Sequence, residues 1–261
     1  MKISVIVPFW NSEKWLGDCC ESLTSQEGDF DFILVDDKST DNSRDIAYEY
    51  CKKDPRFILM TNFRTKGVCG ARNTGLEYAV QEKGWITFLD ADDELLDNAY
   101  PKFTMAIESD KRANIHQFNC MRYYPQIDKT MLKYMNLKGK YHSGKMPMLW
   151  FGVWNKLYRA EFLKDIRFDE SLQYGEDGLF VLECLGKDDY IHHENSSTVK
   201  HRFVNPKSLS KTKTRDDLLD TVHSMEAFML RQDNVQLREF VCMEISRLWS
   251  STRFRELVAC P

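Results

Sequence analysis

Residues Trp85–Glu94 read WITFLDADDE, and this stretch sets the fold that we expect for the chain. Residues Ile86–Leu89 are β-branched, aromatic or aliphatic, with no turn former among them, which predicts a buried strand. Asp90, Asp92 and Asp93 follow directly. Because side chains two apart on a strand share a face, Asp90 and Asp92 are expected to point the same way and to repel each other unless a cation lies between them.

A divalent metal is one explanation of these carboxylates, since Mg²⁺ and Mn²⁺ favour carboxylate and phosphate oxygens. A strand followed by an acidic turn that caps a helix is the other. A short acidic motif does not decide between the two, so the rest of the chain has to.

The composition is that of a globular protein. The chain has 261 residues, of which 43% are hydrophobic and 29% charged, enough for one large domain or two small ones. The net charge of −4 argues against nucleic acid as a partner, which would favour a basic face. A local basic cluster would still suit a small anion such as a nucleotide.

Cysteine usage and hydropathy predict the compartment. The eight cysteines show neither a disulfide framework nor metal-ligand spacing, which indicates reduced thiols in the cytosol. The apolar run of Met1–Trp10 is too short for a signal peptide, and no stretch has the length of a membrane span. We therefore expect a cytoplasmic protein. A peripheral contact at the inner face of the membrane stays open.

Strands and helices alternate over the first hundred residues. Apolar runs predict strands at Ile3–Phe9, Phe32–Val35 and Phe57–Met60, with helical patterns between them. This alternation predicts βαβ units and a parallel sheet, in which a ligand lies at the carboxyl ends of the strands. Three strands end in polar residues there, at Trp10-Asn11, at Asp36-Asp37 and at the acidic cluster after Leu89. The acidic cluster thus falls where a ligand is expected.

Two common nucleotide-binding classes are not supported. The first strand is followed by no Gly-x-Gly-x-x-Gly, and the chain has no Walker-type Gly-Lys-Ser/Thr. This counts against a dinucleotide oxidoreductase and against a P-loop NTPase.

The second half of the chain has a less regular pattern. We expect helices at Asp97–Ser109 and Gly175–Leu185, a strand at Ile115–Tyr124, a short helix and a turn within Arg159–Asp169, one or two strands in Tyr190–Phe203, and helices from Arg215 onward.

Seven segments of the chain match one known family in content and order. They read VIVPFWN at Val5–Asn11, VDDKSTDNS at Val35–Ser43, KGVCGARNTG at Lys66–Gly75, LDADDE at Leu89–Glu94, VWNKLYR at Val153–Arg159, YGEDGLF at Tyr174–Phe180 and KHRFVNPKSLS at Lys200–Ser210. The chain thereby resembles the family-2 glycosyltransferases over residues 1–210, although Lys38 stands where the family usually has glycine. The resemblance implies an α/β GT-A fold, Rossmann-like, with a mixed, mostly parallel sheet flanked by helices, followed here by a C-terminal helical tail.

The resemblance also implies a donor site for a nucleotide sugar. Its expected residues are Pro8, Phe9, Trp10, Asn11, Asp37, Lys66, Arg72, Asp90, Ala91, Arg202 and Lys207. In the family the second Asp of the Asp-Asp turn accepts a hydrogen bond from uracil, which assigns Asp37 and makes a UDP-sugar the expected donor. Trp10 contacts the base or ribose, or is a core aromatic. Arg72 contacts ribose or phosphate, or pairs with Asp90.

The metal and the catalytic base follow from the same resemblance. A divalent Mn²⁺ or Mg²⁺ is implied, with Asp92 as its direct ligand and Asp90 reaching the ribose, the metal or a metal-bound water. Asp93 is a bystander or a supporting group. Asp177 is implied as the general base of an inverting displacement, oriented by Glu176. Carboxylates at a helix N-terminus are also favoured for structural reasons alone.

Two further groups of residues have alternative interpretations. His201, Arg202 and Lys207 either close over the diphosphate or form a solvated basic loop. On the acceptor side we expect Trp154, Asn155 and Lys156, with Trp154 as a core residue as the alternative.

The sequence thus predicts a glycosyltransferase of the hexosyltransferase type, acting on a saccharide or lipid-linked acceptor in surface polysaccharide or glycan synthesis. We expect a donor half at 1–110, an acceptor and catalytic half at 111–214, and a helical tail at 215–261 that packs on the domain or on a second copy as a homodimer. A nucleotidyltransferase and an inactive nucleotide-sugar-binding module remain alternatives.

Overall fold

The computed structural model describes residues 1–125, 128–133, 139–141, 152–188, 190–202 and 214–250. Its strands are β1 (Ile3–Phe9), β2 (Phe30–Asp36), β3 (Phe57–Thr61), β4 (Trp85–Phe88), β5 (Glu94–Leu95), β6 (Ile115–Tyr124), β7 (Lys129–Lys133), β8 (Gly139–Tyr141), β9 (Lys156–Arg159) and β10 (Ile191–Arg202). Its helices are α1 (Leu16–Thr24), α2 (Ser43–Lys53), α3 (Val68–Ala79), α4 (Ala99–Ser109), α5 (Glu176–Lys187), α7 (Arg215–Leu230) and α8 (Val235–Ser250).

The strands form one mixed sheet in the order β3-β2-β1-β4-β9-β6-β10-β5, with β7 beside β6 and β8 beside β10. The first four of these are parallel, β9 is antiparallel to both of its neighbours, and β6 and β10 are parallel. The expected mixed, mostly parallel sheet flanked by helices is therefore confirmed. Its parallel part brings the ends of β1, β2 and β4 to one edge.

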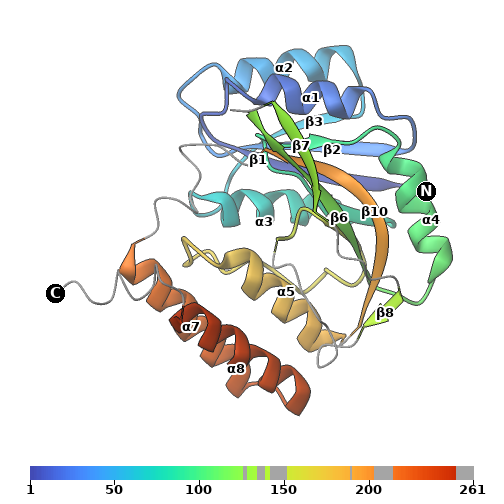
Figure 1. The fold of residues 1–261 in the computed structure, drawn as a ribbon. Helices are drawn as coiled ribbons and strands as arrows, with labels where there is room; N and C mark the ends of the chain where they lie inside the picture. The colour runs from blue at the N-terminus through green and yellow to red at the C-terminus, as the bar shows by residue number, and fades with distance from the viewer. Residues whose placement is uncertain (126–127, 134–138, 142–151, 189, 203–213, 251–261) are drawn as a thin grey trace.

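Helices cover both faces of the sheet (Figure 1). Along β1, Val5 and Val7 pack with α1, α2 and α4, whereas Ile6 packs on the opposite face with α3 and α5. Alternate side chains of a strand point to opposite faces, so a strand whose residues are all buried, as in β1, requires this two-sided covering. The close packing of α3 has a local cause, because a β-carbon at Gly75 would lie 2.6 Å from the Cγ2 of Ile6.

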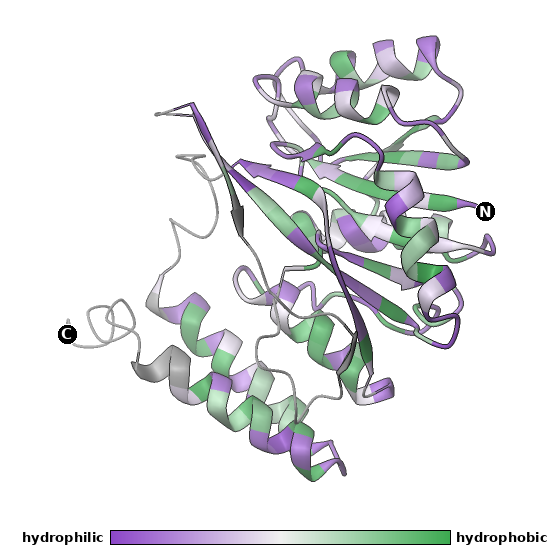
Figure 2. Cartoon of the chain, turned by 45° about the vertical axis from the view of Figure 1, so that its right-hand side comes forward, coloured by the Kyte–Doolittle hydropathy of each residue, from purple (hydrophilic) through white to green (hydrophobic). Residues whose placement is uncertain are grey.

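The helical tail packs on the domain of its own chain. Met225 and Phe228 of α7 and Phe240 of α8 belong to the same buried core as Phe180 of α5. Figure 2 shows hydrophobic and hydrophilic residues interspersed along both helices, as expected for helices that bury one side. Of the two arrangements expected for the tail, the described residues show packing on the domain.

The structure differs from the expected elements around Arg159–Asp169. Instead of a short helix, the chain makes tight turns in which Phe162 N bonds Arg159 O and Leu163 N bonds Ala160 O. The preceding strand β9 was not expected. It has four residues and pairs with β4 and β6, so its strand character comes from its neighbours. Among the described residues, no helix has both the length and the apolarity needed to cross a bilayer.

Candidate active site

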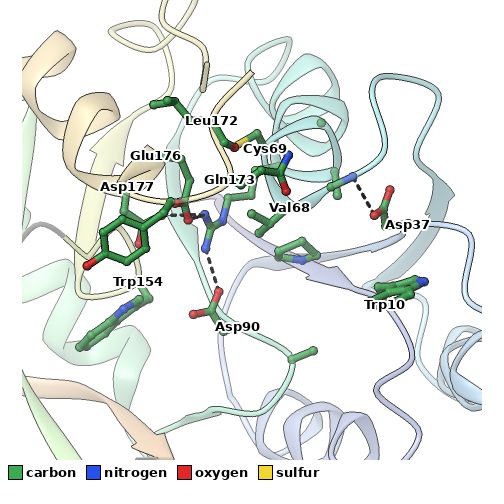
Figure 3. A pocket seen from close by; sticks show the side chains of 18 of the residues that line it. Trp10, Asp37, Val68, Cys69, Asp90, Trp154, Leu172, Gln173, Glu176 and Asp177 are labelled. Carbon is green, nitrogen blue, oxygen red and sulfur yellow. Dashed lines mark hydrogen bonds and ion pairs between the residues drawn. The ribbon is translucent and has the colours of Figure 1, made fainter. Parts of the chain in front are cut away.

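A cavity of about 1250 Å³ opens at the carboxyl ends of β1 and β4. Trp10 and Asp37 lie at one end of it, Trp154, Glu176 and Asp177 lie at the other, and Asp90 lies between them (Figure 3). The lining also includes Pro8, Phe9, Asn11, Lys66, Arg72, Ala91, Asp92 and His201. The cavity therefore gathers most of the residues expected in the donor site, from segments far apart in the sequence.

Trp10 is a surface aromatic at the mouth of the cavity. Its side chain is 53% exposed, so its interpretation as a core residue is wrong. The ammonium of Lys66 lies 5.0 Å from the centroid of the Trp10 ring. An exposed indole beside a cation is a surface on which a flat heterocycle can stack.

Asp37 is held in a fixed orientation next to Trp10. It is buried, and its carboxylate accepts hydrogen bonds from Asn62 Nδ2 at 2.6 Å and from the backbone N–H of Gly67 at 2.8 Å. Gly67 has a φ of +132°, which glycine adopts readily and which aims this N–H at Asp37. Each oxygen keeps a second lone pair for another donor.

The turn that carries Asp37 is braced by its neighbour Asp36. The Asp36 carboxylate accepts from the backbone N–H of Ser39 at 2.8 Å and pairs with Arg44 at 3.0 Å. Lys38, the residue that departs from the family pattern, has a φ of +62°. Glycine adopts that conformation without strain, which accounts for the usual residue at this position. Asn11, two residues after the end of β1, also braces the turn, because its side-chain oxygen accepts from the backbone N–H of Thr40 at 2.8 Å.

Arg72 is the centre of the acidic end of the cavity. Its guanidinium is only 3% exposed and lies 2.6 Å from Asp177, 2.9 Å from Asp90 and 3.4 Å from Glu176. The ion pair with Asp90 was one of the two expectations for Arg72. The contacts with Glu176 and Asp177 were not foreseen, since these residues lie more than a hundred positions away along the chain and no motif links them.

Burial and charge shift the carboxyl pKa values in this cluster. Burial raises the pKa of Asp177, and the Arg72 guanidinium opposes the shift. Burial and the neighbouring Asp177 raise the pKa of Glu176 to about 7. The backbone N–H of Val153 approaches Asp177 at 3.4 Å. A carboxylate with a raised pKa that faces a cavity is a suitable proton acceptor.

The carboxylates of this region fit a divalent cation. Asp90, Asp92, Glu176 and Asp177 line the cavity together with a single guanidinium, that of Arg72, so negative charge is in excess there. Carboxylate oxygens are the donors that Mg²⁺ and Mn²⁺ prefer, and Mg²⁺ beside a diphosphate typically uses one or two of them. Within the described part of the chain, no group of three or more His, Cys, Asp or Glu residues is arranged to hold a metal by itself.

Asp93 is buried behind the cavity lining, where it contacts His201. Its buried carboxylate lies 2.9 Å from Nδ1 of His201, whose ring stacks on Trp154 with centroids 4.9 Å apart. Burial raises the pKa of Asp93 to about 7, although His201 opposes the shift. Burial acts to lower the pKa of His201, but Asp93 outweighs it and the net shift is upward. His201 and Trp154 thus reach the cavity as one stacked pair.

Arg202 lies behind the cavity wall. Its Nε donates to the backbone oxygen of Asp92 at 3.1 Å, and its Nη2 lies 3.3 Å from Glu94 and 3.1 Å from Asp18. The end of β10 is therefore tied to the Asp92–Glu94 segment by a paired arginine. Lys207 lies outside the described residues.

Of the three residues expected on the acceptor side, only Trp154 lines the cavity. Asn155 and Lys156 are each 1% exposed and point into the protein as the chain enters β9. Asn155 donates to Phe118 O at 2.9 Å, and the Lys156 ammonium donates to Gly152 O at 2.7 Å. Burial lowers the pKa of Lys156 to about 7, opposed by Asp177. The expectation of direct acceptor contact by these two residues was wrong, and they instead hold the segment that carries Trp154.

Several cavity residues were missed in the sequence. Leu172, Gln173 and Tyr174 precede the Glu-Asp pair, and Thr221, Met225 and Glu244 come from the tail helices. The tail lies outside the resemblance, so only its packing against α5 brings these side chains to the site.

Comparisons with known proteins report on the family and the fold of the chain. The family model for glycosyl transferase family 2 matches residues 4–167. The chain is 30% identical over 260 residues to a teichoic acid poly(glycerol phosphate) polymerase of Staphylococcus epidermidis. The match covers 92% of this chain and 34% of that protein. The chain spans between 20% and 62% of the length of the curated relatives that it matches.

Solved structures show the same fold. TarS 1–349 of S. aureus, in complex with UDP-GlcNAc, superposes with a TM-score of 0.83 at 21% identity, over 100% of this chain and 76% of that one. The mannosyltransferase PcManGT of Pyrobaculum calidifontis, in complex with GDP-Man and Mn²⁺, gives a TM-score of 0.58 at 14% identity, over 98% of this chain and 78% of that one. The expected GT-A fold is thereby confirmed.

Proposed function

Because the chain belongs to glycosyl transferase family 2, we propose that it transfers a sugar from a nucleoside-diphosphate donor to a hydroxyl of a saccharide or lipid-linked acceptor. A UDP-sugar is the proposed donor, and synthesis of a surface polysaccharide is the proposed role. The relative named as a teichoic acid polymerase and the TarS complex with UDP-GlcNAc support these two choices.

The observation that carries the proposal is the order of groups along the cavity. Trp10 and Asp37 offer a stacking surface and a fixed hydrogen-bond acceptor for a base at one end, and Asp177 offers a proton acceptor at the other. Asp90 lies between them (Figure 3), where the diphosphate of a donor bound in this direction would fall, and Asp92, two residues further along the chain, also lines the cavity. A nucleotide sugar presents its base, diphosphate and anomeric carbon in the same order.

The proposed metal ion is Mn²⁺ or Mg²⁺, held by Asp92 with Asp90 beside it. When bound, it would stabilise the negative charge that develops on the leaving diphosphate. The excess of carboxylates over the single Arg72 guanidinium supports a cation at this place. The Mn²⁺ in the PcManGT complex shows that a protein of this fold can carry such an ion.

Asp177 is the proposed general base. The acceptor oxygen attacks the anomeric carbon, the bond from that carbon to the diphosphate oxygen breaks, and the acceptor proton passes to a carboxylate oxygen of Asp177. Arg72, 2.6 Å from Asp177, keeps the carboxylate oriented towards the cavity, and Glu176 adds to the local negative charge. A single displacement of this kind inverts the anomeric configuration.

The cellular location and the remaining partners are also proposals. The cysteine usage supports a cytoplasmic protein, and a lipid-linked acceptor would require a peripheral contact with the inner face of the membrane. On the acceptor side, Trp154 offers an aromatic surface for the apolar face of a sugar ring, stacked on His201.

The test is product release by the purified chain. The chain would be incubated with Mn²⁺ and UDP-glucose, UDP-galactose or UDP-N-acetylglucosamine, with and without saccharide acceptors. We expect release of UDP, faster with one acceptor class than with water alone. Release of pyrophosphate from UTP and a sugar phosphate would instead indicate a nucleotidyltransferase, and binding of UDP without any turnover would indicate an inactive module.

Inversion has its own measurement, the NMR coupling constant of the new anomeric proton. An α-linked donor should give a β-linked product. A product that retains the donor configuration would refute the role given to Asp177.

A further inference from the structure

The turn that leads into the two catalytic-site carboxylates rests on the helical tail. Residues Tyr174 and Gly175 immediately precede Glu176 and Asp177, the first two residues of α5. Thr221 of α7 lies beneath this turn and is 1% exposed. Its hydroxyl Oγ1 lies 2.7 Å from the backbone oxygen of Tyr174 and 2.8 Å from that of Asp217, so its one proton is available to either carbonyl.

The contact between the turn and Thr221 is also tight in a steric sense. Gly175 has a φ of +74°, and a β-carbon at this position would lie 2.3 Å from Cγ2 of Thr221. The backbone of Gly175 therefore lies directly on the threonine methyl group, while the Tyr174 carbonyl before it lies within hydrogen-bond distance of the threonine hydroxyl. The hydroxyl and the methyl group of Thr221 thus contact two consecutive residues of the turn, Tyr174 and Gly175.

A displacement of this turn would change the position of the proposed base. Asp177 lies three residues after Tyr174, and its carboxylate is 2.6 Å from Arg72, a distance with little tolerance. A shift of about 1 Å in a reacting group can cost about 100-fold in rate. Met225, one turn further along α7, is buried in the main core, so α7 itself is firmly placed.

We propose that Thr221 is a positioning residue for catalysis: it anchors the Tyr174–Asp177 turn, and through it α7 belongs to the framework of the active site. The inference rests on the function proposed above for Asp177. The helical tail lies outside the recognised motifs. The proposal gives it a part in the chemistry, which its packing on the domain alone would not require.

The test compares two substitutions at one position in the full chain. Thr221→Val removes the hydroxyl and keeps the branched shape, whereas Thr221→Ser keeps the hydroxyl and removes the methyl group. Thr104→Val is the matched control, because Thr104 also donates to a backbone oxygen, that of Pro101 at 2.9 Å, but lies on α4 away from the cavity. UDP release gives kcat and KM for the donor, and thermal unfolding gives stability.

We expect Thr221→Val to lower kcat about 10- to 100-fold with the donor KM changed less than about twofold. Thr221→Ser should retain more than about half of the activity, and Thr104→Val should match the unsubstituted chain. Unchanged kcat in Thr221→Val would overturn the inference. So would a parallel loss of kcat, donor affinity and stability that Thr221→Ser does not relieve, because that pattern indicates a structural role alone.

A crystal structure of Thr221→Val tests the anchor without relying on turnover. We expect the Tyr174–Asp177 turn to move and the distance from Asp177 to Arg72 to exceed hydrogen-bond range, about 3.2 Å. A turn that stays in place overturns the inference. An unsubstituted chain that does not bind UDP would reject the proposed function instead, so the two failures are distinguishable.

Discussion

Arg72 and Asp177 show how much the candidate site depends on single contacts. Removing a buried cation from between three carboxylates leaves those charges uncompensated, and breaking a buried pair in this way costs about 3–5 kcal/mol. In the proposed mechanism, the same contact fixes the orientation of the partly exposed Asp177 carboxylate towards the acceptor hydroxyl. Arg72 is thus both a structural centre and a determinant of the pKa of Asp177.

The first prediction concerns Asp177→Asn. The amide keeps the size of the side chain but cannot accept the acceptor proton, so kcat should fall about 10²- to 10⁴-fold while UDP affinity changes little. Steady-state UDP release and calorimetry measure the two quantities. Asp188→Asn is the control, since Asp188 lies at the other end of α5 and accepts a hydrogen bond from Asn114 at 2.7 Å. Full activity in Asp177→Asn would contradict the assignment.

Glu170 gives a prediction about pH and stability. Burial acts to raise its pKa, but hydrogen bonds from Asn73, Arg64 and Thr65 outweigh burial and lower the pKa to about 2. The folded state therefore favours the ionised form more than the unfolded chain does, and the stabilisation is complete above a pH of about 4.5 and is lost as the pH falls towards 2. The lowering of the Glu170 pKa from 4.5 to about 2 corresponds to about 3 kcal/mol of stability.

Urea unfolding of Glu170→Gln at several pH values measures this effect. The variant should be less stable than the unsubstituted chain at pH 6, and the difference should shrink as the pH falls from about 5 to about 2.5. Glu161→Gln, at an exposed position, is the control and should show a small difference at every pH. A constant difference for Glu170→Gln would rule out the linkage.

The sequence predicted the identities of several site residues but not their surroundings. Asp37, Asp90 and Asp177 could be named because each lies in a short motif with its own residue order. The burial of Lys156 and the contacts of Arg72 with Glu176 and Asp177 could not be predicted, because they arise from segments that meet only in the folded chain. No feature of the sequence pointed to Thr221, since it is one threonine within an ordinary amphipathic helix.

Elements were predictable where their signal is local. The first four strands of the chain are mostly apolar runs, and α5 begins at the acidic residues that were expected to open it. Strand β9 was missed because four residues carry little pattern, and pairing with β4 and β6 makes them a strand. The turns after Arg159 contain apolar residues at helical spacing, but their N–H groups bond mostly carbonyls three residues back, and the pattern does not continue into a helix.

The tail helices carry a prediction about packing. Phe228 on α7 is fully buried in the core shared with α5, so Phe228→Ala should destabilise the protein by about 3–5 kcal/mol. Leu230, two residues later, is 80% exposed, and Leu230→Ala should change stability by less than about 0.5 kcal/mol. Chemical denaturation measures both. If Phe228→Ala and Leu230→Ala both changed stability by similarly small amounts, α7 would not be part of the domain core.

At the scale of the whole molecule, the cavity is lined by residues from both expected halves of the domain and from the helical tail. The cavity residues that were expected in the donor site come from the first hundred positions. Asp177 comes from α5, and Met225 comes from the tail. The sheet is continuous through these parts, since β4 pairs with β9 and β9 pairs with β6. A ligand that bridges the cavity would therefore be contacted by all of them, and its binding should stabilise the entire fold.

The central claim, that this cavity is a metal-assisted site for a UDP-sugar, is tested most directly by calorimetric titration of UDP with and without Mn²⁺. We expect UDP to bind in the presence of Mn²⁺, at least about tenfold more weakly without it, and to lose this metal dependence in Asp92→Ala. GDP should bind more weakly, because Asp37 would face a mismatched base edge. UDP binding that is indifferent to both Mn²⁺ and Asp92→Ala, or no stronger than GDP binding, would contradict the claim.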